Sequence, residues 1–287
     1  MARTLVTGAT GFVGRALAPA LAEAGHAVTA LGRADGDVTD AATWGQLPAV
    51  DHVLHLAARN YVPDSWHDPA GFLHANVTGT ARALDYCRST GAHLVLASTA
   101  LFGIPRRLPI REDDVVDPSN PYALSKFLAE RSCAFYASTL NVAVTVIRLV
   151  NVFGPGQRAD FLIPAMIDQV RAGQRIHVKI LTPRRDFLHL DDAVSGLIAA
   201  IAQPAGYRVF NIGSGVSHSV QEVVDIVQKA AGTRLPVVSD EARRPHEIGD
   251  VRADITRARD LLRWAPGVTL EQGIARLLAA EPLVPRK

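Results

Sequence analysis

Apolar residues recur along the first half of the chain in two alternating patterns. Short runs with the length of buried strands occupy Thr4–Val6, Ala27–Leu31, Asp51–Leu56, His93–Ala97 and Val142–Leu149. Between these runs, helical spacing appears at Phe12, Val13, Leu17 and Leu21, from Asp68 to Ser89, and in a helix that begins near Asn120. Strands that alternate with helices predict an α/β fold whose parallel sheet is covered on both faces.

The second half of the chain predicts a smaller unit. The strand pattern breaks at Gly154-Pro155-Gly156, where we expect the chain to leave the sheet. The later pattern predicts helices at Phe161–Ala172, Val220–Ala231 and Ile255–Leu262, a short strand at Ile176–Ile180 and a return segment at Asp186–Leu190. Asp191 or Asp192 could cap the helix that follows this segment. Only the proline-bearing tail after Ala280 looks loose.

A glycine-rich turn joins the first strand to the first helix. Residues 7–14 read TGATGFVG. Gly8 permits a tight turn, Gly11 lets the backbone approach a pyrophosphate, and Gly14 brings the helix close to its strand. The N–H groups at the helix start would then point at the anion. This context predicts a Rossmann-type, doubly wound dinucleotide-binding fold, with a glycine-rich turn that binds no ligand as the alternative. The expected cofactor contacts are Gly8, Thr10, Gly11, Phe12 and Val13.

These elements suggest two structural units. The dinucleotide-binding domain is expected to comprise residues 1–154 with a return segment at about 186–212. Residues 155–185 and 213–287 are expected to form a smaller C-terminal α/β lobe that binds the substrate.

The end of the second strand indicates which dinucleotide binds. A carboxylate there would hold the ribose 2′-hydroxyl of NAD, whereas an arginine accommodates the 2′-phosphate of NADP. Gly32 and Arg33 stand where the acid is expected, so NADP(H) is favoured over NAD(H), although Asp35 lies close by. The segment before the third strand is short. We therefore expect an exposed adenine end, contacted by Asp37 and Val38, and a cofactor that exchanges readily.

Three side chains, those of Ser98, Tyr122 and Lys126, could together perform proton transfer. Ser98 and Thr99 follow the fourth strand, and Tyr122 and Lys126 share one face of a helix because they are four residues apart. A phenol with a pKa of about 10 is a poor base at neutral pH, but a neighbouring ammonium would lower that pKa. Ser98 would fix the substrate oxygen, and Lys126 could also hold the nicotinamide ribose. The alternative is an ordinary exposed helix beside a serine that caps a strand end.

Composition narrows the possible partners and location. The 30 basic and 28 acidic residues are interspersed and give a net charge of +2, which argues against nucleic acid or an anionic membrane as a partner. Cys87 and Cys133 lie in helical patterns, so we expect buried free thiols, without a disulfide framework or metal site, in a reducing compartment. No signal peptide precedes the first strand, and no apolar run reaches about 18 residues. We therefore expect a cytoplasmic protein.

Several motifs recur in one order along essentially the whole chain. They are TGATGFVG (7–14), LAA (56–58), Asn76 with Gly79-Thr80, STALFG (98–103), PYALSK (121–126), RLVNVFGPG (148–156), RRDFLHLDDAV (184–194), FNIGSG (210–215) and RRPHEIGDVRADITRARDLLRWAP (243–266). Together they resemble the extended short-chain dehydrogenase/reductase family, in its nucleotide-sugar epimerase/dehydratase/reductase branch.

The resemblance implies a role for each matching residue. Tyr122 matches the family's acid/base, Lys126 its lysine and Ser98 its Ser/Thr, and Leu56, Ala57 and Ala58 lie beside the cofactor. The implied substrate contacts are Thr99, Asn151 on the sugar nucleotide, and Arg185 and Arg244 on its pyrophosphate. A guanidinium fork suits phosphate oxygens, although surface ion pairs are the alternative and Arg184 could replace Arg185. The family commonly dimerises through the helices after Asp68 and Asn120, so a homodimer is expected.

Departures from the family pattern also carry information. Members that dehydrate their sugar usually place an acidic pair directly after the Ser/Thr. Thr99 and Ala100 occupy those positions, which argues against 4,6-dehydratase activity. Phe102 replaces a tyrosine, a change expected to affect only packing, and the role of Arg59 is open.

Four functions are compatible with these residues. The leading hypothesis is an NADPH-dependent reductase of the 4-keto group of a nucleotide-linked 6-deoxysugar, with Tyr122 protonating the new hydroxyl. The second is a nucleotide-sugar 4-epimerase that keeps its NAD. A reductase of small non-nucleotide carbonyls would leave Arg185 and Arg244 idle, and a nucleotide-sensing regulator would not need Tyr122.

Overall fold

A six-stranded parallel sheet forms the centre of the larger unit. The computed structural model describes residues 1–203, 206–241 and 248–280. The strand order is β2-β1-β3-β4-β5-β9, and every neighbouring pair is parallel. The strands are β1 (Arg3–Thr7), β2 (Ala27–Leu31), β3 (His52–His55), β4 (His93–Thr99), β5 (Val144–Leu149) and β9 (Tyr207–Ile212). The predicted doubly wound α/β fold is confirmed.

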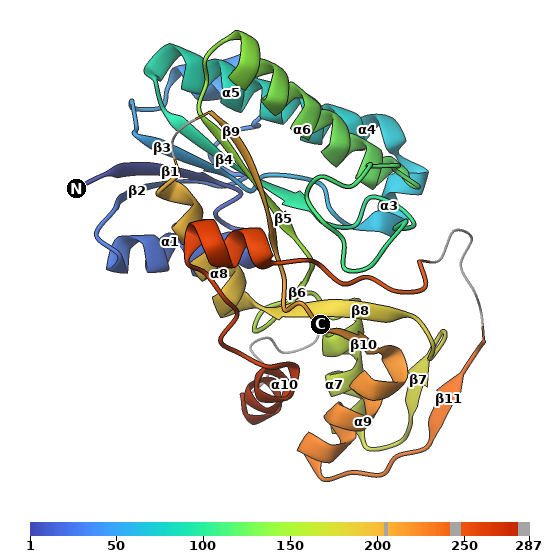
Figure 1. The fold of residues 1–287 in the computed structure, drawn as a ribbon. Coiled ribbons are helices and arrows are strands. Elements are labelled where there is room, and N and C mark those ends of the chain that lie inside the picture. Colours follow the sequence, from blue (N-terminus) through green and yellow to red (C-terminus); the bar gives the residue numbers. More distant parts are fainter. Residues whose placement is uncertain (204–205, 242–247, 281–287) are drawn as a thin grey trace.

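Helices cover both faces of this sheet (Figure 1). One face packs on α1 (Phe12–Glu23) and α8 (Leu190–Ile201), and the other on α2 (Ala41–Gly45), α5 (Gly79–Thr90) and α6 (Pro121–Thr139). Successive residues of one strand point to opposite faces, so Val95 packs towards α1 and α8 whereas Leu94 and Leu96 pack towards α5 and α6. Burial on both faces explains why the strands read as continuous apolar runs.

The helix predicted from Asp68 to Ser89 is divided into three parts. It begins as α4 (Pro69–Leu73), widens into a π-helical turn at His74–Thr78, and continues as α5. Asp68 caps α4, because its carboxylate accepts a hydrogen bond of 2.9 Å from Gly71 N. A short helix that the sequence pattern did not predict, α3 (Val62–His67), precedes α4. The π turn places the buried Asn76 next to α6, as described below.

The smaller lobe lies beyond the carboxyl ends of the main strands (Figure 1). Within the described residues, its elements are the sheet β10-β8-β6, the strand pair β11-β7 and the helices α7, α9 and α10. Their bounds are β6 (Asn151–Phe153), α7 (Leu162–Ala172), β7 (Ile176–Val178), β8 (Arg184–His189), β10 (Ser217–Ser219), α9 (Val220–Ala231), β11 (Val237–Ser239) and α10 (Leu270–Ala279). The lobe has its own apolar core, which includes Phe153, Met166, Val224 and Ile274. After β8 the chain returns to the main sheet through α8 and β9.

The predicted capping role of Asp191 or Asp192 is wrong. His189 caps α8 instead, because its Nδ1 accepts a hydrogen bond of 3.2 Å from Asp191 N. Asp192 is buried and accepts hydrogen bonds from Gly267 N and Val268 N, at 2.8 and 3.0 Å. Its carboxylate therefore fixes the segment before α10, a contact that depends on tertiary packing. The helix predicted at Ile255–Leu262 is a short π-helical segment at Ala258–Leu262.

Two expectations from composition can be compared with the structure. Cys87 and Cys133 are both buried free thiols, as predicted. Across the described ranges, no helix combines the length and the apolar character needed to cross a membrane.

A buried ion pair joins β5 to α6. Arg148 Nη2 lies 2.7 Å from Glu130 Oε2, and Arg148 Nε also donates to this carboxylate. The two side chains are only 9 % and 3 % exposed. Arg148 also donates to the Glu112 carbonyl and lies over the ring of Phe102. Several partners therefore compensate the buried charge of Arg148, and Arg148 in turn compensates that of Glu130.

Removal of one member of this pair should be strongly destabilising. In Arg148→Met the Glu130 carboxylate stays buried without its partner, so we expect the free energy of unfolding to fall by about 3–5 kcal/mol in urea titrations. The double variant Arg148→Met/Glu130→Leu should recover most of this loss. Arg3→Ala, which breaks an exposed pair with Asp51, serves as the control and should change stability little. If Arg148→Met lowered the free energy of unfolding as little as Arg3→Ala does, the prediction would be wrong.

Candidate active site

The glycine-rich turn after β1 approaches its neighbours too closely for side chains. Gly8 has a φ of +68°, and a Cβ there would lie 2.7 Å from Ala57 N. A Cβ on Gly14 would lie 2.2 Å from Gly8 O. Gly11 caps α1 without a side-chain hydrogen bond, and the first helical turn, which begins with Phe12 and Val13, carries no acidic residue. The N-terminal N–H groups of α1 are thus available to an anion, and this cradle fits a dinucleotide pyrophosphate.

The segment after β3 closes one side of this cradle. Leu56 N donates to Thr7 O and Ala57 N donates to Thr7 Oγ1, both at 3.2 Å. Ala58 follows as an exposed residue. The LAA segment is therefore attached directly to the start of the glycine-rich turn, as expected if both line one cofactor site.

The end of β2 presents both a cation and a carboxylate. Arg33 is exposed. Asp35 turns back, and its Oδ2 accepts a hydrogen bond of 2.8 Å from Gly32 N. A Cβ on Gly32 would lie 2.6 Å from Thr10 Cγ2, so the predicted cofactor residue Thr10 packs against this strand end. The carboxylate is thus engaged with backbone, whereas the guanidinium extends into solvent.

Asp37 and Val38 form the next turn of the chain. Asp37 Oδ1 accepts hydrogen bonds of 2.8 Å from the backbone and the hydroxyl of Thr39, and these contacts lower its pKa. Val38 Cγ2 lies 3.1 Å from the position of a Cβ on Gly79, at the start of α5. The short segment between β2 and β3 therefore packs on α5, beside the end of β2.

Tyr122 lies in the first turn of α6, which Asn120 caps by accepting from Ala123 N at 2.8 Å. A side-chain hydrogen bond connects Tyr122 to Thr99 at the end of β4. Burial raises the pKa of Tyr122 to about 12, and the Thr99 hydrogen bond offsets this only in part. The expected lowering by a neighbouring ammonium is therefore wrong for this arrangement, because desolvation dominates and Lys126 is not among the groups that shift this pKa.

Lys126 is buried one helical turn after Tyr122. Its Nζ donates a hydrogen bond of 2.6 Å to Ala97 O on β4. Burial lowers the pKa of Lys126 to about 8, against the effect of Glu130, which raises it. The amine thus loses its proton more readily than an exposed lysine, and it is held at the same strand end that carries Ser98 and Thr99.

Ser98 is buried and has an unpaired hydroxyl, as expected of a side chain that hydrogen-bonds a ligand. It is 6 % exposed, and its Oγ has no hydrogen-bond partner within the described residues. Buried hydroxyls are usually paired, so an unpaired one at the carboxyl edge of a parallel sheet suits a group that receives a substrate oxygen. Ser98, Thr99, Tyr122 and Lys126 therefore converge on the end of β4.

Asn76 holds this arrangement together, a role that our sequence analysis did not identify. Its Oδ1 accepts from Arg59 N at 2.8 Å, and its Nδ2 donates to Arg59 O and Ser125 Oγ at 2.9 and 2.8 Å. Ser125 Oγ donates in turn to Tyr122 O at 2.7 Å. The amide thus links the segment after β3 to the first turn of α6. A buried asparagine inside an otherwise amphipathic helix was the available signal.

Two of the predicted substrate residues, Asn151 and Arg185, lie on the smaller sheet. Asn151 on β6 donates to Asp186 O on the neighbouring β8 at 3.2 Å. Arg185 Nη1 donates to Arg184 O and Ile248 O, at 2.8 and 2.7 Å. Arg184 forms an ion pair with Glu222 at 3.0 Å. This pairing argues against Arg184 as a replacement for Arg185 in binding a pyrophosphate. Arg244 lies outside the described residues.

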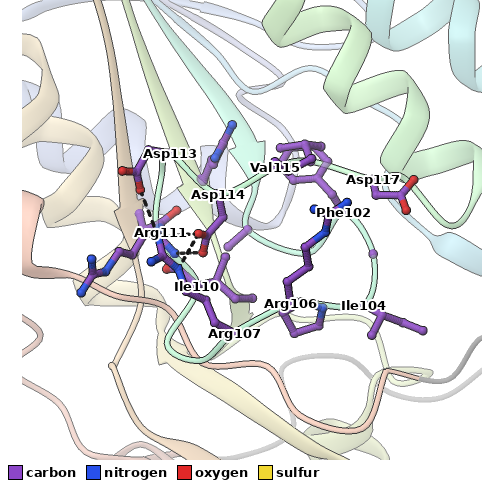
Figure 2. A pocket seen from close by; sticks show the side chains of 16 residues that line it. Phe102, Ile104, Arg106, Arg107, Ile110, Arg111, Asp113, Asp114, Val115 and Asp117 are labelled. Atoms are coloured by element: carbon purple, nitrogen blue, oxygen red, sulfur yellow. Dashed lines mark hydrogen bonds and ion pairs between the residues drawn. The ribbon is translucent and has the colours of Figure 1, made fainter.

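A separate cavity of about 320 Å³ lies under the loop that follows β4 (Figure 2). Within this loop Arg107 pairs with Asp114 at 2.6 Å. Ile110 exchanges backbone hydrogen bonds with Arg252 O and Asp254 N, at 2.7 and 2.8 Å. Among the described residues, the cavity wall includes none of the four groups at the end of β4. The loop thus connects the end of β4 by hydrogen bonds to the segment that precedes the π-helical turn at Ala258–Leu262.

Comparison with known proteins supports the family that the sequence motifs resemble. The family model described as the NAD dependent epimerase/dehydratase family matches residues 4–213. The chain is 33 % identical to GDP-6-deoxy-D-mannose reductase of Pseudomonas aeruginosa, with 96 % of each chain covered. It is 32 % identical to UDP-glucose 4-epimerase of Mycolicibacterium smegmatis, also with 96 % of each covered.

A solved structure shows how far the similarity extends in three dimensions. RMD from Pseudomonas aeruginosa, complexed with NADPH, is 31 % identical and superimposes with a TM-score of 0.89 over 97 % of this chain and 98 % of that one. The fold, the motif order and these matches agree. The chain therefore belongs to the NAD-dependent epimerase/dehydratase family, within the extended short-chain dehydrogenases/reductases that its motifs resemble.

Proposed function

We propose that this protein is a reductase that acts on the 4-keto group of a nucleotide-linked 6-deoxysugar and favours NADPH as the reductant. The observation that carries this proposal is the state of Tyr122. Its raised pKa keeps the phenol protonated at neutral pH, at the sheet edge where Ser98 has an unpaired hydroxyl. Reduction of a ketone needs a proton donor at the carbonyl oxygen, whereas oxidation of an alcohol needs a base first.

The side chains at the end of β4 would divide the work. The dinucleotide, held by Gly8, Gly11 and the start of α1, supplies the hydride when bound. Ser98 Oγ orients the ketone oxygen, and the Tyr122 hydroxyl gives its proton to that oxygen. In the structure Lys126 donates to Ala97 O and does not shift the Tyr122 pKa, so in this proposal its charged amine would turn towards the phenolate only after the proton has left. An opposite charge in a buried site would then lower the free energy of the ionised form.

Two of the comparisons support reduction with NADPH. One is a nucleotide-sugar reductase by name, and RMD is a solved NADPH complex. The exposed Arg33 supports the same cofactor, because a guanidinium at the end of β2 can bind a 2′-phosphate. Thr99 and Ala100 supply no carboxylate beside Ser98, so the acidic pair expected of a dehydratase is missing at these positions.

A 4-epimerase with bound NAD is the second candidate. Asp35 lies at the end of β2, where a carboxylate could accept from a ribose 2′-hydroxyl once it turns from Gly32 N. The similarity to UDP-glucose 4-epimerase, at 32 % identity, also favours it. This enzyme would need Tyr122 to remove a proton before it returns one, which the raised pKa disfavours.

Two broader features complete the proposal. A homodimer would pack the helix that follows Asn120 against its copy, and α6 does expose Leu124, Leu128 and Phe135 at helical spacing. The buried free thiols are compatible with the expected cytoplasmic location.

The reaction can be tested with purified protein, NADPH and a panel of nucleotide 4-keto-6-deoxysugars. We expect stoichiometric loss of NADPH absorbance with at least one member of the panel. Tyr122→Phe should reduce turnover by about 10²–10⁴-fold because the proton donor is lost, while NADPH binding, measured by fluorescence, stays intact.

Tyr136→Phe is the matched control for this experiment. Tyr136 lies on the same helix but bonds to Asp85 at 2.9 Å, so its variant should keep full activity. No oxidation of NADPH with any member would count against the reductase. Inversion of a sugar nucleotide without net redox change would favour the epimerase.

The pH dependence of kcat/KM should show one descending limb. Lys126 is charged below its pKa of about 8 and neutral above it, so the stabilisation of the phenolate should be lost as the pH rises through 8. Tyr122 stays protonated throughout this range because its pKa is about 12. Lys126→Met should have a lower kcat/KM, and its pH profile should lack the decrease near pH 8. Activity that instead increases with pH would indicate that Tyr122 acts first as a base.

Arg33 should determine the choice between the two dinucleotides. Arg33→Ala removes the cation available to a 2′-phosphate, so we expect the KM for NADPH to rise at least about tenfold while that for NADH changes little. Arg88→Ala, at the exposed end of α5, provides the control. Equal effects of Arg33→Ala on both cofactors would exclude recognition of the phosphate.

A further inference from the structure

The side chain of Arg59, whose role was open from the sequence, packs on an aromatic ring. Its guanidinium carbon lies 4.5 Å from the centroid of Phe72, a distance typical of a cation–π contact. The same guanidinium forms an ion pair with Asp68, the residue that caps α4. Asn76 holds the Arg59 backbone on both its N–H and its carbonyl. Arg59 is therefore fixed at its backbone and at its charged end.

Gly71 makes room for this arrangement. A Cβ at Gly71 would lie 2.3 Å from Arg59 Nη1 and 2.1 Å from Asp68 Oδ2. The backbone of Gly71 is helical, so its conformation would accept a side chain, but the space is already taken by the ion pair. The Arg59 guanidinium thus occupies the space next to α4 that a side chain at position 71 would need.

Phe72 connects this cation to Tyr122. Its ring is 1 % exposed and stands edge to face with the Tyr122 ring, with centroids 6.4 Å apart and ring planes at 85°. Such geometry is the favoured arrangement for an aromatic pair. Arg59 covers Phe72, and Phe72 contacts the phenol. The three side chains form a continuous stack from the surface to the end of β4.

We propose that Arg59 is a positioning residue for Tyr122 and acts through Phe72, an inference that rests on the proposed function of Tyr122 as proton donor. The amine of Lys126 is engaged with Ala97 O, and the hydroxyl of Tyr122 is held by Thr99. The remaining contact, that of the Phe72 ring with the Tyr122 ring, therefore restricts the orientation of the phenol. Loss of the guanidinium frees the outer face of Phe72 and allows both rings to reorient.

Stability alone does not explain this arrangement. The Arg59 and Asp68 side chains are 35 % and 51 % exposed, and exposed ion pairs contribute little to folding. Asp68 caps α4 through Gly71 N whether or not Arg59 is present. The contact that is specific to Arg59 is the one with the buried ring beside Tyr122.

Steady-state kinetics provide the first test. In Arg59→Ala we expect kcat to fall about tenfold and KM to stay within about twofold, because a misdirected donor weakens only the transition state. Arg59→Lys should recover part of kcat, since an ammonium can also lie over Phe72. Gly71→Ala should lower kcat at least as much as Arg59→Ala, because its methyl displaces both the guanidinium and the Asp68 carboxylate that holds it. A rise in KM with unchanged kcat would instead make Arg59 a ligand-binding residue and overturn the proposal.

A spectroscopic measurement tests the proposal without turnover. The chain has five tyrosines, and incorporation of 3-fluorotyrosine would give ¹⁹F resonances, with Tyr122 assigned by its loss in Tyr122→Phe. Arg59→Ala should shift or broaden the Tyr122 resonance, and Arg59→Lys should largely restore it. Arg158→Ala is the matched control, because Arg158 pairs with Asp160 and covers the ring of Tyr61. This control should leave Tyr122 unchanged.

The two measurements separate the proposal from the reductase assignment. If no sugar nucleotide is reduced but the Tyr122 resonance responds to Arg59→Ala as expected, the positioning contact stands and the assigned reaction fails. An unchanged Tyr122 resonance in Arg59→Ala overturns the positioning role, whether or not kcat falls.

Discussion

Desolvation at the end of β4 is the interaction on which the candidate site depends. It acts on two neighbouring side chains of opposite charge type. Burial makes the charged form of each costly, so the phenol of Tyr122 holds its proton and the amine of Lys126 releases its proton more easily. The consequence is a site that starts as a proton donor, with a cation that can be retained or lost near neutral pH. The protonation state from which the proposed reduction would start follows from burial rather than from residue identity alone.

Much of the fold followed from local patterns, because a parallel sheet covered on both faces leaves a strong apolar signal. The turn at Gly8 was also recognisable, since its chemistry depends on backbone geometry within one strand–turn–helix unit. The features that were missed depend on distant partners. Asp192 resembles a helix cap until its contacts with Gly267 and Val268 are seen, and the π turn at Asn76 accompanies a hydrogen bond from that side chain to Ser125 on α6.

The candidate site was predictable as a set of residues but not as an electrostatic environment. Ser98, Tyr122 and Lys126 could be selected by position and chemistry. The Tyr122 pKa shift had the opposite direction because spacing reveals proximity along a helix and does not reveal solvent exclusion. Thr99, predicted as a substrate contact, also bonds Tyr122. Asn76 appeared in the sequence only as a family motif, although it connects Arg59 to the helix of Tyr122.

The contacts around the glycine-rich turn also limit how this protein could be redesigned. Gly8 and Gly14 touch backbone atoms directly, so any added carbon there would have to push apart main chain rather than a side chain. Arg33 and Ala34, in the exposed turn that follows β2, are both open to solvent. An engineer who wishes to exchange one coenzyme for another would therefore leave the cradle untouched and diversify that turn. In the proposed site, the cradle would hold the pyrophosphate that both coenzymes share, and the turn would contact the ribose at which they differ.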